Sequence, residues 1–415
     1  MSRKRIYLDY AATTPLDPRV EKVMQAFMRK QFGNPSSIHA EGAAAKKALD
    51  AARTSVARSL EAHSEEIVFT SGGTEANNLA IFGVIEAFTR FNLESGKRLN
   101  LVKKGVHIVT TNIEHASVLE PLRELEKQGV SVTYVPVEPS GIVKPEKIMA
   151  AIRPNTVLVS VMYANNEIGT VQPIRKIGQE IRKLREVKSQ KLKVNGPNEK
   201  GYPLFHSDAC QAPLYLNCLV NALGVDVMTL DAHKMYGPKG IGALYVRRGT
   251  PIAPQIVGGG QERGLRSTTE NVPAIVGFAK ALEIAVLERK QESIRLEKLR
   301  DSLHSHILKN VRMSGGNEIL INGSMEKEER LPNNLNISLP GVDTEFLTLQ
   351  LDVKGVAVST KSSCLKDEHE SYVIRALGSD KTRSSSSLRF TLGRKTTKQE
   401  VESAAQILSD LLSAE

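Results

Sequence analysis

The chain contains the sequence Thr229-Leu-Asp-Ala-His-Lys-Met-Tyr-Gly-Pro-Lys-Gly240, in which a short apolar run is followed by Lys234 and then by a glycine turn. The run has the composition of a buried strand, so Lys234 is expected where that strand ends. A lysine amine becomes an effective nucleophile toward an aldehyde when a fixed, partly desolvated position lowers its pKa. The pattern therefore favours a Schiff-base lysine, although a solvated loop lysine in a basic protein would give the same local sequence.

Similar β-rich runs recur upstream of this segment, with helical patterns between most of them. They lie at residues 66–70, 106–110, 131–135, 157–162, 204–207 and 225–230. Alternating strands and helices are typical of α/β proteins, and nearly continuous apolar strands indicate helices on both faces of a sheet. We therefore predict an α/β fold with a mainly parallel, mixed sheet covered by helices, and a ligand site beyond the carboxyl ends of its strands.

Length and a change of pattern in the last third predict two domains. At 415 residues the chain exceeds the size of one simple core. We assign residues 16–288 to a large domain, and residues 1–15 plus 289–415 to a smaller α+β domain with strand-like runs at 334–339 and 388–391. Two polar stretches, 90–104 and 185–203, are predicted to be surface insertions or long loops.

Composition and charge exclude several classes of protein. Hydrophobic residues make up 40% of the chain and charged residues 25%, and no run of about 18 apolar residues could span a bilayer. The net charge of +10 comes from lysines and arginines spread along the sequence without a nucleic-acid motif, so we expect a basic solvated surface and no direct nucleic-acid binding. The N-terminus lacks the pattern of a signal or transit peptide, which leads us to expect a cytoplasmic location.

Polar segments follow several predicted strands, where a ligand would bind. After strand 66–70, the sequence Ser71-Gly-Gly-Thr-Glu-Ala-Asn-Asn78 enters a helix, which predicts a turn and helix N-terminus able to hold one phosphate. His115 and Asp208 follow two other strands. Ordinary alternatives exist for each feature, namely a plain glycine turn, a structural histidine, and an aspartate paired with arginine or capping a helix.

Together these features predict one cofactor. A phosphate cradle, an acid for a protonated ring nitrogen, a histidine that covers the ring and a strand-end lysine are what pyridoxal 5′-phosphate requires. Few other cofactors need all four groups.

Seven segments in order along nearly the whole chain extend this pattern: Tyr7-Leu-Asp-Tyr-Ala-Ala-Thr-Thr-Pro15, Phe32-Gly-Asn-Pro-Ser-Ser37, Thr70-Ser-Gly-Gly-Thr-Glu75, Glu114-His115, Asn165-Asn-Glu-Ile-Gly169, His233-Lys234, and Gly258-Gly-Gly-Gln-Glu-Arg263 with Arg266-Ser267. The set resembles the cysteine desulfurases, class-V members of the fold-type-I pyridoxal-phosphate enzymes. The resemblance implies conversion of L-cysteine to L-alanine, with sulfur supplied for iron–sulfur cluster assembly or tRNA thiolation.

The resemblance also implies a role for each matching residue around the cofactor ring. Lys234 would hold the cofactor through a Schiff base, and Asp208 would pair with the ring nitrogen. His115 would stack on the ring and assist proton transfer. Asn166 and Gln211 would contact the ring substituents.

The phosphate and substrate groups are assigned by the same resemblance. The phosphate would be held by Gly73, Thr74 and His233. Thr269 would reach the phosphate bound in a neighbouring subunit, which implies a homodimer with shared sites. Asn34 and Arg389 would bind the substrate carboxylate, for which an arginine can supply two parallel hydrogen bonds.

Cys364 determines the reaction type in this interpretation. It lies in Ser359-Thr-Lys-Ser-Ser-Cys-Leu-Lys-Asp-Glu-His-Glu370, a polar segment without apolar periodicity that is predicted to be a loop. Lys361 and Lys366 would favour the thiolate. The thiolate would attack the substrate sulfur and become a persulfide, which a mobile loop could carry to a sulfur-acceptor or scaffold protein.

The cysteine count supports neither a disulfide framework nor a structural metal site. The chain has three cysteines without a Cys-x-x-Cys pair, and an odd number argues against a set of disulfides. Cys210 and Cys218 stand in apolar sequence and are predicted to be inert. Cys364 could transiently ligate an iron–sulfur cluster.

The chain departs from the family pattern at three places. Asp231 stands where many relatives have a serine that hydrogen-bonds the phosphate, and a carboxylate there would repel a dianion. Thr268 replaces a glycine, and the segment that follows Cys364 is slightly short. A selenocysteine lyase is the nearest alternative function, because the two reactions share almost every residue. A non-catalytic scaffold of the same fold has support only from Asp231.

Overall fold

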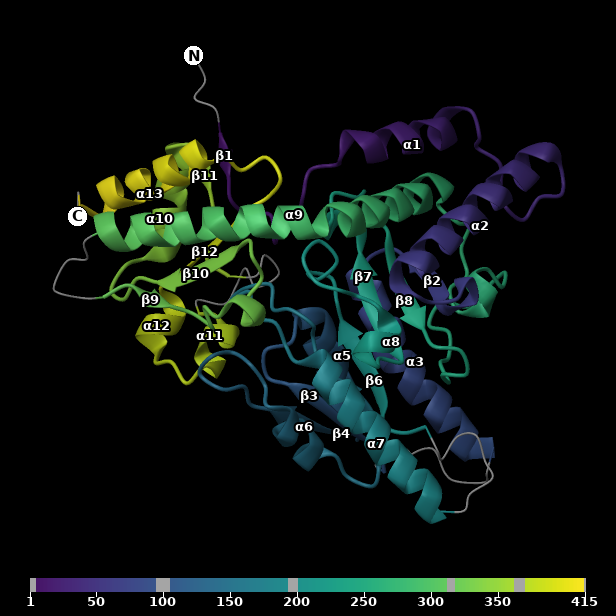
Figure 1. Cartoon of the computed structure of the whole chain (residues 1–415). Helices are drawn as coiled ribbons and strands as arrows, with labels where there is room; N and C mark the ends of the chain where they lie inside the picture. The colour runs from purple at the N-terminus through teal and green to yellow at the C-terminus, as the bar shows by residue number, and fades with distance from the viewer. Residues whose placement is uncertain (1–4, 95–104, 193–200, 312–317, 362–369, 414–415) are drawn as a thin grey trace.

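A seven-stranded mixed sheet organises the larger part of the computed structural model (Figure 1), which describes residues 5–94, 105–192, 201–311, 318–361 and 370–413. In spatial order its strands are β2 (Ile67–Thr70), β8 (Gly242–Val246), β7 (Val227–Asp231), β6 (Leu204–Asp208), β5 (Thr156–Ser160), β3 (His107–Thr111) and β4 (Ser131–Val135). Strand β8 is antiparallel to both of its neighbours, and all other neighbours are parallel. The predicted α/β fold with a mainly parallel, mixed sheet is confirmed.

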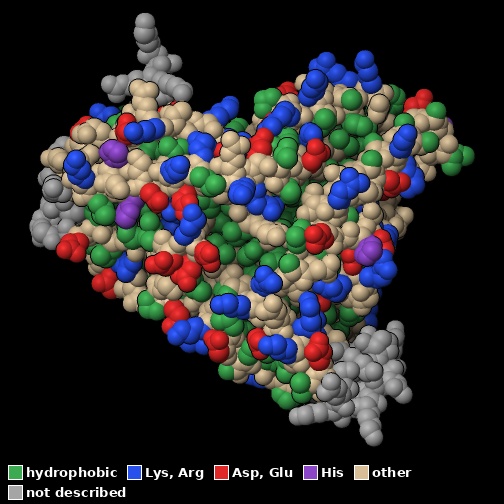
Figure 2. All heavy atoms as spheres, viewed as in Figure 1, with side chains coloured by type: hydrophobic (Ala, Val, Ile, Leu, Met, Phe, Trp, Pro, Cys, Tyr) green, Lys and Arg blue, Asp and Glu red, His purple; other side chains and the backbone are tan. Residues whose placement is uncertain are grey.

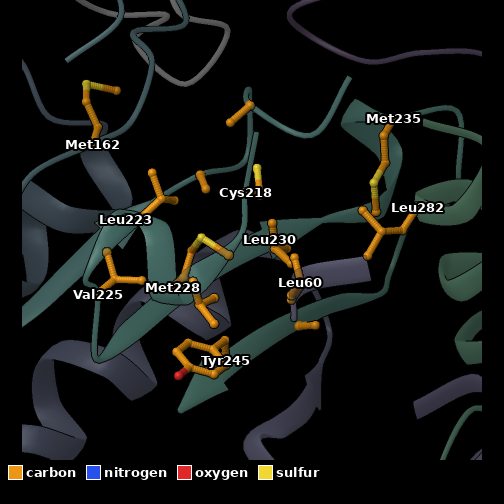
Figure 3. Packing of buried hydrophobic residues seen from close by; sticks show 14 of the residues in the cluster. Leu60, Met162, Cys218, Leu223, Val225, Met228, Leu230, Met235, Tyr245 and Leu282 are labelled. Atoms are coloured by element: carbon orange, nitrogen blue, oxygen red, sulfur yellow. The ribbon is translucent and has the colours of Figure 1, made fainter. Parts of the chain in front are cut away.

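Helices cover both faces of this sheet, because successive side chains of each strand point to opposite sides and both sides are buried. In β5, Leu158 packs in a cluster with α3 (Gly73–Glu94) and α5 (Ala116–Lys127). Its neighbour Val159 packs in the opposite cluster, part of which Figure 3 shows. The helices of that second face are α2 (Ala40–Leu60), α6 (Pro145–Ala151), α7 (Ile174–Leu192) and α9 (Val272–Asn310). Two further helices are α1 (Pro18–Arg29), which packs on α9, and the short α8 (Val220–Leu223).

A second hydrophobic core lies beside the first and is built from the two ends of the chain. Its strands are β9 (Leu320–Ile321), β10 (Asn334–Ser338) and β12 (Ser387–Thr391) in one antiparallel sheet, and β1 (Ile6–Tyr7) paired in parallel with β11 (Val356–Ala357). Its helices are α10 (Thr344–Val353) and α13 (Lys398–Ser413), whereas α11 (Tyr372–Ala376), which α12 (Lys381–Ser385) follows, packs Val373 and Ile374 in the first core.

Helix α9 joins the two cores, as its long course across Figure 1 shows. Phe278 packs in the first core and Leu303 in the second. The helix begins where the Asn271 side chain accepts the backbone N–H of Ala274, and proline at its second position suits a first turn. The predicted boundary between residues 288 and 289 falls inside this continuous helix, and the division into two domains stays a prediction.

The prediction of loops was wrong at the start of both polar stretches. Residues 90–94 continue α3 and residues 185–192 continue α7. In α7 the reason is tertiary, because Arg185 forms an ion pair with Asp226 and donates to the carbonyl of Pro203 at 2.9 Å. Residues 95–104 and 193–200 lie outside the described residues.

Charge and hydropathy over the described part of the molecule agree with the composition. Figure 2 shows basic and acidic side chains interspersed over the face viewed in Figure 1. Of the described helices, none is both apolar enough and long enough to cross a bilayer.

Candidate active site

A cavity of about 200 Å³ opens at the carboxyl ends of strands β5, β6 and β7, as predicted for a ligand in this class of fold. Most of the predicted site residues line it: Gly73, Thr74, His115, Asn166, Asp208, Gln211, His233, Lys234 and Arg389. They come from segments that are far apart in sequence, so the ends of parallel strands bring the chemistry together.

The anion cradle forms where β2 turns into α3. Gly73 is the first residue of the helix, and its backbone N–H points to the cavity side of the turn. A Cβ atom on residue 73 would lie 2.7 Å from the Cys210 sulfur and 3.2 Å from Asp231 Oδ2, so only glycine fits. Thr74 follows it in the cavity wall. His233 closes the opposite side, with its Nδ1 3.0 Å from the hydroxyl of Thr13.

Lys234 lies on a single 3₁₀ turn that follows β7 directly, as its sequence position predicted. Its Nζ donates to the backbone carbonyls of Ala11 and Ala12, both at 2.8 Å. These two carbonyls hold the amine in the cavity. No sequence pattern predicts these two contacts, because the backbone oxygens of an N-terminal segment leave no mark on side-chain patterns.

Asp208 ends β6 with a buried carboxylate that is surrounded by N–H donors. Asn77 Nδ2 donates to Oδ2 at 2.7 Å and the backbone N–H of Cys210 donates to Oδ1 at 2.9 Å. Only 7% of the residue is exposed, and no cation pairs with it in the described part of the chain. Sequence reasoning missed Asn77, whose position in the first turns of α3 was the only available signal.

His115 follows β3 and is the N-cap residue of α5. Its Nδ1 accepts the backbone N–H of Ser117 at 3.1 Å and lies 2.8 Å from the Ser117 hydroxyl. Because Nδ1 acts as an acceptor, the neutral ring carries its proton on Nε2.

Glu114, beside His115, is a fully buried carboxyl group. Burial raises its pKa to about 8, and the nearby Asp208 charge acts in the same direction. Two donors work against this, since Thr111 Oγ1 at 2.6 Å and the backbone N–H of Met162 at 3.0 Å both bind Oε1. Within the described residues, Oε2 has no hydrogen-bond partner. Glu114 therefore favours its protonated form at neutral pH.

Arg389 lies on β12 of the second core and reaches the cavity wall with 1% of its surface exposed. Nη2 forms an ion pair with Asp9 Oδ1 at 2.7 Å, and Nη1 donates to the backbone carbonyl of Asn166 at 2.9 Å. Its Nε has no hydrogen-bond partner among the described residues. Gln211 is fixed nearby by a hydrogen bond from its Nε2 to the carbonyl of Ala11 at 3.0 Å.

Comparisons with known proteins place the chain in a family. The aminotransferase class-V family model matches residues 6–403. Cysteine desulfurase IscS of Dictyoglomus turgidum is 42% identical over 412 residues, which cover 99% of this chain and 95% of the relative. Cysteine desulfurase IscS 1 of Archaeoglobus fulgidus is 39% identical over 407 residues, covering 98% and 96%. The chain belongs to the cysteine desulfurase family.

Solved structures agree with this cysteine desulfurase assignment. A structure described as a NifS-like protein superposes with a TM-score of 0.84, at 37% identity, and covers 99% of this chain and 100% of that one. A second, SspA in complex with cysteine, gives a TM-score of 0.73 at 31% identity, covering 94% and 99%. The predicted family and fold type are both confirmed.

Two described residues that are expected in a cysteine desulfurase site, Asn34 and Thr269, are not brought to this cavity. Asn34 is exposed, and its Oδ1 accepts the backbone N–H of Ser36 in the loop between α1 and α2. Thr269 is also exposed and does not line the cavity. Cys364 lies outside the described residues. The roles of all three stay predictions.

The other two cysteines differ from each other. Cys218 is buried in the first core (Figure 3), where burial raises the pKa of its thiol to about 12, in line with an inert residue. The prediction of apolar surroundings was wrong for Cys210, which lines the cavity. Burial raises the pKa of the Cys210 thiol, and the charges of Asp208 and Asp231 raise it further.

The described residues contain no cluster of His, Cys, Asp or Glu suited to a metal ion.

Proposed function

We propose that this chain is a pyridoxal 5′-phosphate-dependent cysteine desulfurase that converts L-cysteine to L-alanine and takes the sulfur onto Cys364 as a persulfide. The observation that carries the proposal is the convergence of the Lys234 amine, the Asp208 carboxylate and the Gly73 amide in one cavity of a cysteine desulfurase chain. The sulfur would serve iron–sulfur cluster assembly or tRNA thiolation.

The residues that line the cavity suit the ring and the amine linkage of the cofactor, but one of them conflicts with its phosphate. The buried Asp208 carboxylate has N–H donors and no described cation, so a protonated ring nitrogen would complete its surroundings. Lys234 supplies the amine, while Gly73, Thr74 and His233 would hold the phosphate. Asp231 is the exception, because its carboxylate lies in the cradle.

In this reaction four residues of the cavity have separate roles. When bound, the cofactor ring supplies the electron-withdrawing group that makes the substrate α-proton acidic. Asp208 would keep the ring nitrogen protonated, and the Lys234 amine, which lines the same cavity, would move the α-proton. His115 lines the same cavity, with its Nδ1 held by the backbone N–H of Ser117, and would stack on the cofactor ring. Arg389 orients the substrate through its carboxylate.

Sulfur transfer balances in atoms and electrons between the enzyme thiol and the substrate thiol. The Cys364 thiolate forms an S–S bond with the substrate sulfur while the substrate C–S bond breaks. The electron pair of that bond stays on the carbon fragment, which takes up a proton and leaves as alanine. The enzyme thiol and L-cysteine thus become an enzyme persulfide and L-alanine, without an external oxidant.

We further propose a cytoplasmic homodimer that passes the persulfide sulfur to an acceptor or scaffold protein. The exposure of Thr269, outside the cavity of its own chain, is compatible with a contact to the phosphate of a neighbouring subunit.

The proposal is tested with purified protein, cysteine and the Cys364→Ala variant. We expect bound cofactor by its absorbance, alanine release from cysteine, and a persulfide on Cys364 by mass spectrometry. Cys364→Ala should lose the persulfide and nearly all alanine release, and keep the cofactor. Cys218→Ala, a matched change at the buried cysteine of the first core, should retain activity. A persulfide that forms as fast in Cys364→Ala would refute the mechanism.

The same assay distinguishes a cysteine desulfurase from a selenocysteine lyase, the nearest alternative function. A selenocysteine lyase would release alanine from selenocysteine with a much higher kcat/KM than from cysteine. A desulfurase releases alanine from cysteine and depends on Cys364 for it.

A further inference from the structure

The Asp231 carboxylate occupies the anion cradle of the cavity. Its Oδ2 accepts the backbone N–H of Gly73 at 2.7 Å, the first amide of helix α3. Its Oδ1 accepts the backbone N–H of His233 at 3.2 Å, and Oδ2 lies 3.5 Å from His233 Nε2. Only 7% of the residue is exposed. One carboxylate therefore bridges the two segments that are expected to hold a phosphate.

The position of Asp231 is fixed by its own backbone. It is the last residue of β7 and the N-cap of the 3₁₀ turn that carries Lys234. The amide N–H groups at a helix start, with the positive end of the helix dipole, favour an anion. In this chain that anion is covalently part of the protein, so it meets the amide at a high effective concentration.

A cofactor phosphate would need the same amide. The Gly73 N–H has a single hydrogen atom, and the carboxylate repels a second anion that comes close to it. We propose that Asp231 is an internal occupant of the phosphate site, competing with the phosphate for the Gly73 amide. This inference rests on the proposed function, since it concerns the phosphate of that cofactor.

A distinctive affinity pattern follows. Binding of the cofactor then depends mainly on the Lys234 amine and the Asp208 contact, and its phosphate contributes little net affinity. Pyridoxal, which lacks the phosphate, should bind the wild-type chain almost as well as pyridoxal 5′-phosphate does. Removal of the carboxylate should restore the preference for the phosphorylated compound.

The test compares Asp231→Ser and Asp231→Asn with the wild-type full-length chain, freed of cofactor. Serine removes both the charge and the bridge, whereas asparagine removes the charge and keeps an acceptor for the Gly73 amide. Titrations followed by absorbance give the Kd of pyridoxal 5′-phosphate and of pyridoxal.

In Asp231→Ser we expect a Kd for pyridoxal 5′-phosphate roughly tenfold lower or more, with the Kd for pyridoxal within about twofold of wild type. Asp231→Asn should show a smaller gain. Asp50→Ser, at an exposed position of α2, controls for net charge and should change neither Kd.

A second measurement needs no cofactor. Inorganic phosphate should raise the Tm of cofactor-free Asp231→Ser and leave the wild-type Tm nearly unchanged. Equal phosphate shifts in both proteins, or an unchanged ratio of the two Kd values, would overturn the inference alone. A higher Kd for pyridoxal 5′-phosphate in Asp231→Ser would also overturn it, by showing that Asp231 assists the phosphate through His233. If no protein in the series, wild type included, binds the cofactor, the proposed function fails as well.

Discussion

Arg389 illustrates how much of the chemistry depends on a single buried side chain. Two of its guanidinium nitrogens are satisfied by Asp9 and by the carbonyl of Asn166, while Nε has no described partner. A buried charged donor without a partner is costly, and a substrate carboxylate would supply one. The Asp9 contact fixes the guanidinium plane before substrate arrives, which reduces the ordering that binding requires.

We expect Arg389→Lys to raise the KM for cysteine by roughly 10- to 100-fold, because lysine cannot reproduce a two-pronged contact and a charge-assisted hydrogen bond is worth about 1.5–3 kcal/mol. Steady-state kinetics measure this, and the absorbance of bound cofactor checks the integrity of the site. Arg394→Lys is the matched control, since Arg394 pairs with Asp17 outside the cavity lining. A KM equal to wild type in Arg389→Lys would remove Arg389 from substrate binding.

Glu114 makes stability depend on pH. Its folded pKa of about 8 lies above the ordinary value of 4.5, so the folded chain holds this proton more tightly than the unfolded chain does. The contribution of this proton to the free energy of unfolding is fully present below pH 4.5 and is lost as the pH rises through 8. Glu114→Gln keeps an acceptor for Thr111 and Met162 but does not titrate.

The free energy of unfolding of wild type, relative to Glu114→Gln, should therefore fall by a few kcal/mol between pH 4.5 and 8, since each pH unit in that window changes it by about 1.4 kcal/mol. Denaturant titrations at several pH values measure the difference. Glu120→Gln, an exposed change on α5, should show no such trend. Parallel curves for wild type and Glu114→Gln would disprove the assignment.

Among the secondary-structure elements, helix α2 ends on a residue whose backbone conformation is strained. The capping residue, Glu61, has φ 53 and ψ 42, in the left-handed region that favours glycine. Its backbone N–H donates to the carbonyls of Ala57 and Arg58, so the cap forms despite the strain. Side chains other than glycine pay about 1–2 kcal/mol in this conformation.

Glu61→Gly should raise the free energy of unfolding by about 0.5–1 kcal/mol, after the extra entropy of glycine in the unfolded chain is subtracted. Thermal or denaturant unfolding measures the change. Glu61→Ala removes the same carboxylate and keeps the Cβ atom, so it should give no gain. Equal stabilisation by alanine and glycine would show that charge, and not backbone strain, is responsible.

At the scale of the whole molecule, two histidines connect strands inside the central sheet. His206 lies between Ser160 of β5 and Thr229 of β7, with ring nitrogens 2.9 and 3.1 Å from their hydroxyls. His107 of β3 contacts Thr156 and Thr133 in the same way, at 2.8 Å each. Burial lowers the pKa of both histidines to about 4.

These histidines should make the fold sensitive to acid. Because both folded pKa values lie below 6.5, the unfolded chain binds more protons, and stability is lost as the pH falls from 6.5 toward 4. We expect the free energy of unfolding to decrease across this window and the decrease to be smaller in His206→Gln. Denaturant titration at pH 7, 5.5 and 4.5 tests this. His39→Gln, at an exposed site, is the control and should follow wild type. An identical pH dependence in His206→Gln would exclude the histidine as the cause.

The class of fold and most residues of the cavity could be predicted from local sequence patterns. Apolar β-rich runs predict buried strands, parallel strands align their carboxyl ends, and so Lys234, Asp208, His115 and Gly73 had to meet there. These inferences needed only local patterns and one topological rule.

The contacts between distant segments could not be predicted in this way, because they depend on how the chain packs. The carbonyls of Ala11 and Ala12 reach Lys234, and Asn77 reaches Asp208, because backbone atoms and helix faces meet in three dimensions. The same holds for Asp231. Its sequence position predicted only repulsion of a phosphate, whereas folding brings its carboxylate to the Gly73 amide and makes it an occupant of the site. Side-chain direction and long-range contact are set by packing, which local sequence does not encode.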